Sequence, residues 1–262
     1  IDKGRGNANK WMARILWEVQ QVIDIQLISF DGGSLRNAIP REATAVVSVS
    51  DLSAFTTEFN RISATIKEEY ARIEPNCQFN MTTTSGSQQA MASADFKKII
   101  SLLCSVHNGV YRMSPDIEGL VETSSSLARI IIKDGLFVSQ SLQRSSVEST
   151  KREVCMVMRC AFENAGCQVE QTGDYPGWKP NPNSGILNLM ENLYQELFQE
   201  NVQVKACHAG LECGILGKHL PGVDMISFGP NIRAAHSPDE KVQISSVQKF
   251  WNYYLETLKR IA

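Results

Sequence analysis

The chain has 262 residues, of which 43% are hydrophobic, and a formal net charge of −2 at pH 7. A chain of this length can bury a sizeable core and ordinarily forms one or two domains. Acidic and basic residues are interspersed, which argues against a nucleic-acid or anionic membrane surface, and no apolar stretch approaches the ~20 residues that span a bilayer.

The spacing of apolar and turn-forming residues predicts the elements of the first part of the chain. They are a helix over residues 7–21, strands over 24–30 and 44–49, a helix over 53–73 with Ser53 as its N-cap, a strand over 78–84, a helix over 93–106, strands over 119–128 and 128–142, and a helix over 148–165. Asp134-Gly135 is a strong hairpin signal, and Gly166 is suited to follow the last helix. Together, these elements predict an α+β fold with helices packed on a mainly antiparallel sheet.

A stretch rich in proline and glycine, residues 173–183, has the composition of a linker. Beyond it the pattern predicts a helix over 186–199, strands over 202–206 and 225–228, and a C-terminal amphipathic helix with apolar residues at Val247, Phe250, Trp251, Tyr254, Leu255 and Leu258. Two strands are too few to bury these helices. We therefore expect this tail to be an incomplete α/β portion that needs strands from elsewhere.

Two loops of the tail concentrate polar side chains. The loop over residues 207–214 holds His208 and Glu212, and the loop over 229–240 holds His236 just before the C-terminal helix. An imidazole in such a loop serves as a metal ligand, as an acid or base, or as a loop residue bonded to backbone. A thiolate zinc site in the first loop is not favoured, because its two cysteines lack Cys-x-x-Cys spacing.

These two loops resemble the C-terminal motifs of the aminoacyl-histidine dipeptidases, which are carnosinase-like exopeptidases with two zinc ions. The resemblance extends over essentially the whole chain, in the family's order, through residues 6–10, 32–42, 141–146, 175–180, 208–214 and 229–240. It implies a lid and dimerisation domain over residues 1–174. Residues 175–262 are then the C-terminal portion of a zinc-peptidase catalytic domain that hydrolyses Xaa-His dipeptides.

Motifs of the family's N-terminal catalytic half have no counterpart here. None of the four histidines begins a His-x-Asp motif, and the only Glu-Glu pair, Glu68-Glu69, lies in a charged helical segment that reads as a solvated face. The resemblance therefore implies a fragment that contains no catalytic residues of its own. We expect it to be inactive by itself and to need the missing N-terminal half as a partner.

The resemblance also implies a set of substrate-binding residues. Arg144 matches an arginine that holds the substrate's terminal carboxylate, for which a guanidinium fork is suited; the alternative is a surface salt bridge. Asn37 matches a lid amide that bonds the scissile carbonyl, or else it only shapes the turn before the following proline. Gly210, His208 and Glu212 match the wall of the substrate pocket, and for His208 and Glu212 a role in orienting other ligands stays open.

One residue, His236, matches the family's C-terminal metal ligand. A neutral imidazole can complete a two-zinc site whose other ligands are carboxylates. The alternative is a loop histidine bonded to backbone. The sequence departs from the family's pattern in the spacer Ala234-Ala235. There we would expect a glycine between Arg233 and His236.

The alternative function is a non-catalytic module for dimerisation or peptide binding. An exposed sheet edge or helix face would bury well against a second copy, giving a homodimer through the lid domain. A peptide binder would rest on Arg144 and Asn37 alone. Seven cysteines without a disulfide-like rhythm favour a reducing compartment, so we predict a cytoplasmic protein.

Overall fold

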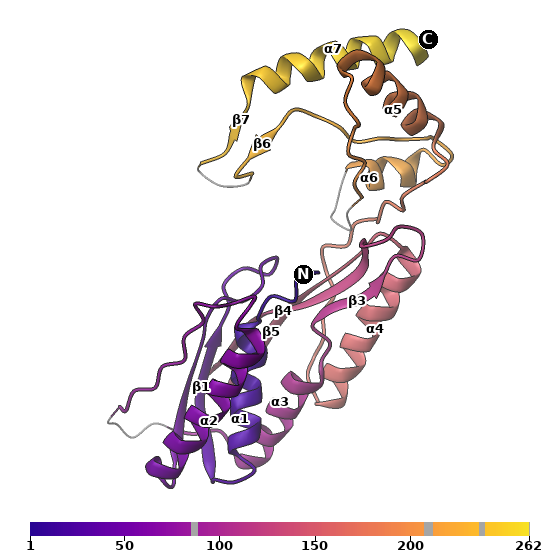
Figure 1. The fold of residues 1–262 in the computed structure, drawn as a ribbon. Helices are drawn as coiled ribbons and strands as arrows, with labels where there is room; N and C mark the ends of the chain where they lie inside the picture. The colour runs from indigo at the N-terminus through magenta and orange to yellow at the C-terminus, as the bar shows by residue number, and fades with distance from the viewer. Residues whose placement is uncertain (85–88, 207–211, 236–238, 262) are drawn as a thin grey trace. The chain divides into compact units, whose positions relative to one another are not determined.

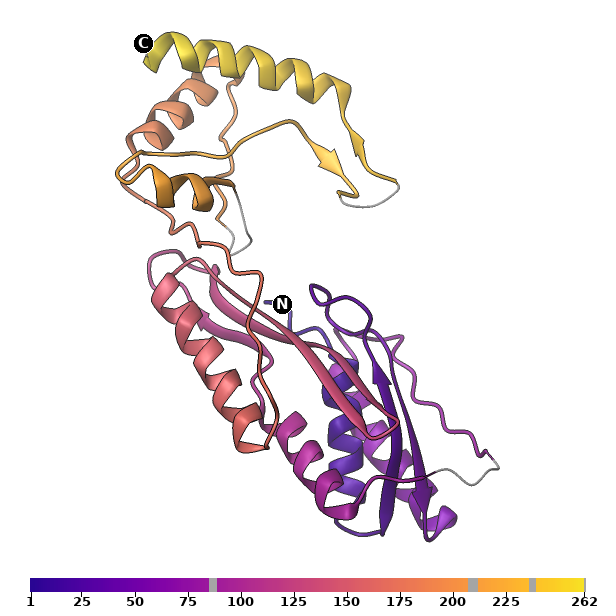
Figure 2. The ribbon, with the colours of Figure 1, turned by 180° about the vertical axis from the view of Figure 1, so that it is seen from behind.

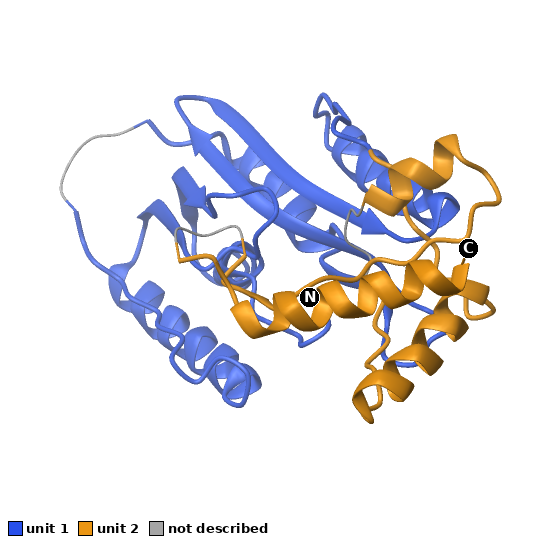
Figure 3. Cartoon of the chain, turned by 90° about the horizontal axis from the view of Figure 1, so that it is seen from above, with its two compact units in different colours: residues 1–174 blue, residues 175–262 orange. Residues whose placement is uncertain are grey.

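A computed structural model describes residues 1–84, 89–206, 212–235 and 239–261 (Figure 1). The chain divides into two compact units, unit 1 over Ile1–Asp174 and unit 2 over Tyr175–Ala262 (Figure 3). The break between them falls at the start of the stretch rich in proline and glycine. None of the described helices is long and apolar enough to cross a membrane.

Unit 1 contains an antiparallel sheet of five described strands. They are β1 Ile25–Gly32, β2 Ala43–Val49, β3 Gly109–Met113, β4 Val121–Lys133 and β5 Leu136–Ser145. β5 pairs along its whole length with residues 123–133 of β4, while β1 and β3 pair with different parts of the other edge of β4. Among the described strands, β2, β3 and β5 each pair with a single neighbour and are therefore edge strands.

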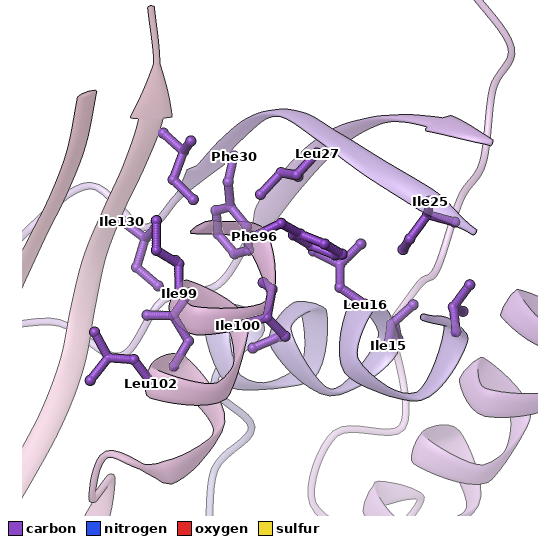
Figure 4. Packing of buried hydrophobic residues seen from close by; sticks show 14 of the residues in the cluster. Ile15, Leu16, Ile25, Leu27, Phe30, Phe96, Ile99, Ile100, Leu102 and Ile130 are labelled. Carbon is purple, nitrogen blue, oxygen red and sulfur yellow. The ribbon is translucent and has the colours of Figure 1, made fainter. Parts of the chain in front are cut away.

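The described helices of unit 1 pack on one face of this sheet (Figure 2). They are α1 Ala8–Val19, α2 Leu52–Tyr70, α3 Ser93–Ser105 and α4 Glu148–Asn164. Between helices and sheet lies a continuous apolar core, in which Phe30 of β1 and Ile130 of β4 meet Leu16 of α1 and Phe96 of α3 (Figure 4). Helices on one face of an antiparallel sheet confirm the predicted α+β class.

The segment 6–10, which the sequence marks as a motif, joins α1 to its neighbours. Asn7 caps α1 by accepting from the backbone N–H of Lys10 at 3.1 Å, and its amide donates to the Leu127 carbonyl at 3.1 Å. Lys10 Nζ donates to three carbonyls at the end of α3, at 2.7 to 3.0 Å. Burial lowers the pKa of Lys10. The motif thus satisfies the last carbonyls of α3, which have no partner within their own helix.

Several predicted elements of unit 1 differ from the observed ones. Residues 78–84 form no strand: they carry β-forming side chains but pair with none of the described strands, and such side chains make a strand only when a partner strand is present. The hairpin turn is at Asp134-Gly135 as predicted, with φ of 52° and 75°. β4, however, runs unbroken through Ala128, where the sequence pattern placed a boundary and where the structure has a bulge between Leu127 and Arg129.

The N-cap of α2 is Asp51, and the prediction of Ser53 is wrong. Asp51 has extended backbone angles and accepts from the Ala54 N–H at 3.0 Å, whereas Ser53 lies inside the first turn.

We expect Asp51→Ala to lower the free energy of unfolding by about 1 kcal/mol, because it removes the acceptor for an otherwise unpaired N–H. Ser53→Ala is the matched control and should change it by less than about 0.5 kcal/mol. Urea denaturation measures both, and a larger loss in Ser53→Ala would contradict the assignment.

Unit 2 is built mainly of helices. Its described elements are α5 Gly185–Phe198, α6 Glu212–His219, β6 Ile232–Arg233, β7 Lys241–Val242 and α7 Ile244–Ile261. The strands predicted over 202–206 and 225–228 are wrong: these residues are irregular and pair with neither β6 nor β7, which pair with each other. α6 went unpredicted because two glycines interrupt its helical pattern.

A small core joins α5 to α7 in unit 2. It consists of Met190, Leu193 and Tyr253, and the Tyr253 hydroxyl donates to the Met190 carbonyl at 2.6 Å. Burial raises the pKa of Tyr253 to about 12, so the hydroxyl remains a donor at neutral pH. The predicted C-terminal helix is confirmed, but much of its apolar stripe is exposed: Trp251 is 54% exposed, and Val247, Leu255 and Leu258 are also exposed.

Candidate functional site

Arg144 is the next-to-last residue of β5, where the strand turns into α4. It lies opposite Ser124 of β4 and is half-buried. Its Nε is shielded from solvent and has no hydrogen-bond partner among the described residues. A shielded donor without an acceptor is unfavourable. The position therefore suits a site in which a ligand or another polypeptide segment supplies the acceptor.

Asn37 lies in the loop between β1 and β2 and is exposed. The loop is closed at its base, where the Gly33 N–H donates to the Glu42 carbonyl at 3.0 Å, and it turns at Asn37, where the Ala38 N–H donates to the Leu35 carbonyl at 3.2 Å. Gly33 has a φ of 72°, and a Cβ there would lie 1.9 Å from the Ala128 carbonyl oxygen. Only glycine fits this close approach of the loop to β4.

The register of the sheet brings this loop and Arg144 toward the same end of unit 1. The base of the loop lies against Ala128, four residues along β4 from Ser124, which lies opposite Arg144. In Figures 1 and 2 the loop between β1 and β2 and the start of β4 lie at the same end of the sheet. Two candidate donors, a guanidinium and a side-chain amide, are therefore carried at one end of the sheet.

The remaining predicted site residues belong to unit 2. Glu212 is exposed and is the first residue of α6, where a carboxylate interacts favourably with the helix dipole. His208, Gly210 and His236 lie outside the described residues, so their roles stay predictions.

No metal site can be assembled from the described residues. They contain no group of three or more His, Cys, Asp or Glu side chains placed to hold an ion. The described cysteines are free, and burial raises the pKa of the Cys213 thiol, which disfavours the thiolate that binds metals. The described residues therefore do not fit a complete zinc centre.

Comparisons with known proteins place these features in a family context. The sequence matches the peptidase family M20/M25/M40 over residues 11–260. It is 37% identical over 263 aligned residues to the cytosol non-specific dipeptidase of Escherichia coli strain K12, in an alignment that covers 100% of this chain and 54% of that protein. The crystal structure of an aminoacylhistidine dipeptidase from Vibrio alginolyticus matches 98% of the chain with a TM-score of 0.90 and 39% identity, and the chain covers 53% of it. The chain thus spans about half the length of these relatives.

Proposed function

The chain belongs to the peptidase family M20/M25/M40, and on that basis we propose that it forms the substrate-recognition part of a dipeptidase. The observation that carries the proposal is Arg144, whose shielded Nε has no acceptor among the described residues. A dipeptide with a free C-terminus brings a carboxylate, which a guanidinium binds through two parallel hydrogen bonds. The Vibrio alginolyticus structure is named for aminoacylhistidine substrates, which supports Xaa-His dipeptides as the substrate class.

In the proposed reaction, water attacks the carbonyl carbon of the peptide bond, the C–N bond breaks, and the amine leaves with a proton. Asn37 donates its amide N–H to the carbonyl oxygen, where negative charge develops during the attack. Arg144 fixes the other end of the substrate, so the scissile bond is held at a constant position. Gly210, His208 and Glu212 line the pocket in this proposal.

The proposed metal is zinc, with His236 as one of its ligands. Since the described residues do not form a complete site, the other ligands and the general base would come from the part of the relatives that this chain does not span. The proposed location is the cytosol, which the name of the Escherichia coli relative supports.

We also propose that unit 1 mediates homodimerisation. β5 spans Leu136–Ser145 and pairs, among the described strands, with β4 alone, so one of its backbone edges is open. Such an edge is suited to pairing with the same strand of a second copy about a two-fold axis.

The test is a dipeptidase assay on Ala-His, with Ala-Leu for comparison, in the presence of zinc and after chelation. The chain is assayed alone and after coexpression with the part of the Escherichia coli relative that it does not span. Zinc-dependent activity only after coexpression, with Ala-His preferred, is the expected result. Activity of the chain alone would contradict the assignment of missing ligands. No activity in either sample, together with a stable dimer by light scattering, would favour the dimerisation module.

A further inference from the structure

Three buried hydroxyl groups meet behind Arg144, on the helix side of the sheet. Thr123 of β4, Ser145 of β5 and Thr150 of α4 are each at most 5% exposed. Thr123 Oγ1 lies 2.8 Å from Ser145 Oγ and 3.0 Å from Thr150 Oγ1, and Ser145 Oγ lies 3.0 Å from Thr150 Oγ1. Residues from three separate elements thus share one compact polar contact.

The cluster ends on a buried carboxylate. Thr150 Oγ1 donates to Glu122 Oε1 at 3.0 Å, and Arg112 Nε lies 3.5 Å from the same oxygen. At the other end, the Val147 N–H donates to Ser145 Oγ at 3.0 Å. One arrangement uses every proton once: Val147 N–H to Ser145, Ser145 to Thr123, Thr123 to Thr150, and Thr150 to Glu122. Hydrogen bonds in such a chain reinforce one another, and the carboxylate strengthens the last of them.

This chain of bonds fixes the backbone from which Arg144 projects. Ser145 follows Arg144 directly and is the last residue of β5. The Ser146 N–H donates to the Glu122 carbonyl at 3.1 Å, so the turn into α4 is bonded to β4 through the main chain as well. Since successive side chains of a strand point to opposite faces, the hydroxyls lie on the face of α4 and Arg144 lies on the other face.

We propose that Thr150 is a positioning residue for Arg144. It closes the hydroxyl chain between α4 and β4, and in doing so it holds the end of β5 in the one geometry that directs the guanidinium toward the substrate carboxylate. The expected effect on substrate binding rests on the proposed function, whereas the expected effect on the order of the Arg144 side chain does not. Valine has the shape of threonine but can neither donate to Glu122 nor accept from Thr123, so Thr150→Val removes the link with little change in volume.

The experiment records the arginine Nε–H signals of the 15N-labelled chain by NMR, with the Arg144 signal assigned by its loss in Arg144→Lys. Because Nε of Arg144 is shielded from solvent, its proton should exchange slowly with water. We expect Thr150→Val to shift this signal and to speed its exchange at least about 10-fold, a change that a loss of stability alone would spread over all the arginine signals. Thr150→Ser, which keeps the hydroxyl, should restore it.

Ser149→Ala is the matched control, since Ser149 is the exposed neighbour of Thr150, and it should leave the signal unchanged. An unchanged Arg144 signal in a folded Thr150→Val would overturn the proposal. If Thr150→Val does not fold, Ser145→Ala is used in its place, because it removes the acceptor of the Val147 N–H. A shifted Arg144 signal in this variant would support the proposal, and an unchanged signal would overturn it. A shifted signal in Thr150→Val, combined with an unaltered KM in Arg144→Lys, would reject the carboxylate-binding role and leave the positioning role standing.

Discussion

Arg144→Lys is expected to lower kcat/KM for dipeptides about 10- to 100-fold, mostly through a higher KM. The guanidinium offers two parallel donors to a carboxylate, whereas the lysine ammonium is a point charge that cannot reproduce this geometry. A hydrogen bond to a charged group contributes about 1.5–3 kcal/mol, which sets the expected range. The measurement is steady-state kinetics on the coexpressed, active preparation.

The substrate itself provides the control for Arg144. A dipeptide amide has no terminal carboxylate, so Arg144→Lys should change its kcat/KM by less than about 3-fold, within the range of an uncharged contact. Arg159→Lys is the matched variant, because Arg159 is a half-buried arginine of α4 that pairs with Glu163 at 3.0 Å. Equal losses for the free acid and the amide would show that Arg144 does not read the carboxylate.

Phe30→Ala is expected to lower the free energy of unfolding of unit 1 by about 3–5 kcal/mol. Phe30 of β1 is 0% exposed and belongs to the continuous core between the helices and the sheet. Truncating a buried phenyl ring removes its contacts and leaves a cavity that the surrounding side chains fill only in part. Urea denaturation gives the change, and hydrogen exchange of peptides from β1 and β4 assigns it to unit 1.

Leu136→Ala is the matched comparison for Phe30. Leu136 belongs to the same sheet but stands at the hairpin, where it is 62% exposed. Its truncation should change the stability by less than about 0.5 kcal/mol. Similar losses in the two variants would mean that Phe30 does not occupy the core as described.

Elements with strong local signals were predictable from the sequence. The Asp134-Gly135 pair specifies a tight hairpin whatever surrounds it, and Gly166, with a φ of 77°, follows α4 as the pattern predicted. The amphipathic periodicity located the described helices other than α6 to within a few residues. These features depend on neighbours along the chain, which the sequence displays directly.

Elements that depend on distant partners were less predictable. β3 is a strand because β4 lies beside it, whereas residues 78–84 and 202–206 have similar β-forming side chains but pair with none of the described strands. A strand forms only where its backbone N–H and C=O groups can pair with a neighbouring strand on at least one side. A pattern of residues cannot show whether that partner is present.

The candidate site was likewise predictable from the sequence only in part. Arg144 and Asn37 came from motif resemblance, and the structure adds their surroundings but leaves their roles as proposals. The hydroxyl chain was missed, although the polar run Glu122-Thr123 at the start of a long strand was a signal. What the sequence could not show is that Thr150, 27 residues from Thr123, closes the chain.

The two separate cores also determine how the chain responds to heat. Unit 1 encloses a large apolar cluster shared by four helices and the sheet, whereas the core of unit 2 consists of Met190, Leu193 and Tyr253. Cooperative melting requires one continuous core, so the two units should melt in separate transitions, with unit 2 first. A single melting temperature would therefore not describe this chain, and a calorimetric trace should be fitted with two enthalpies.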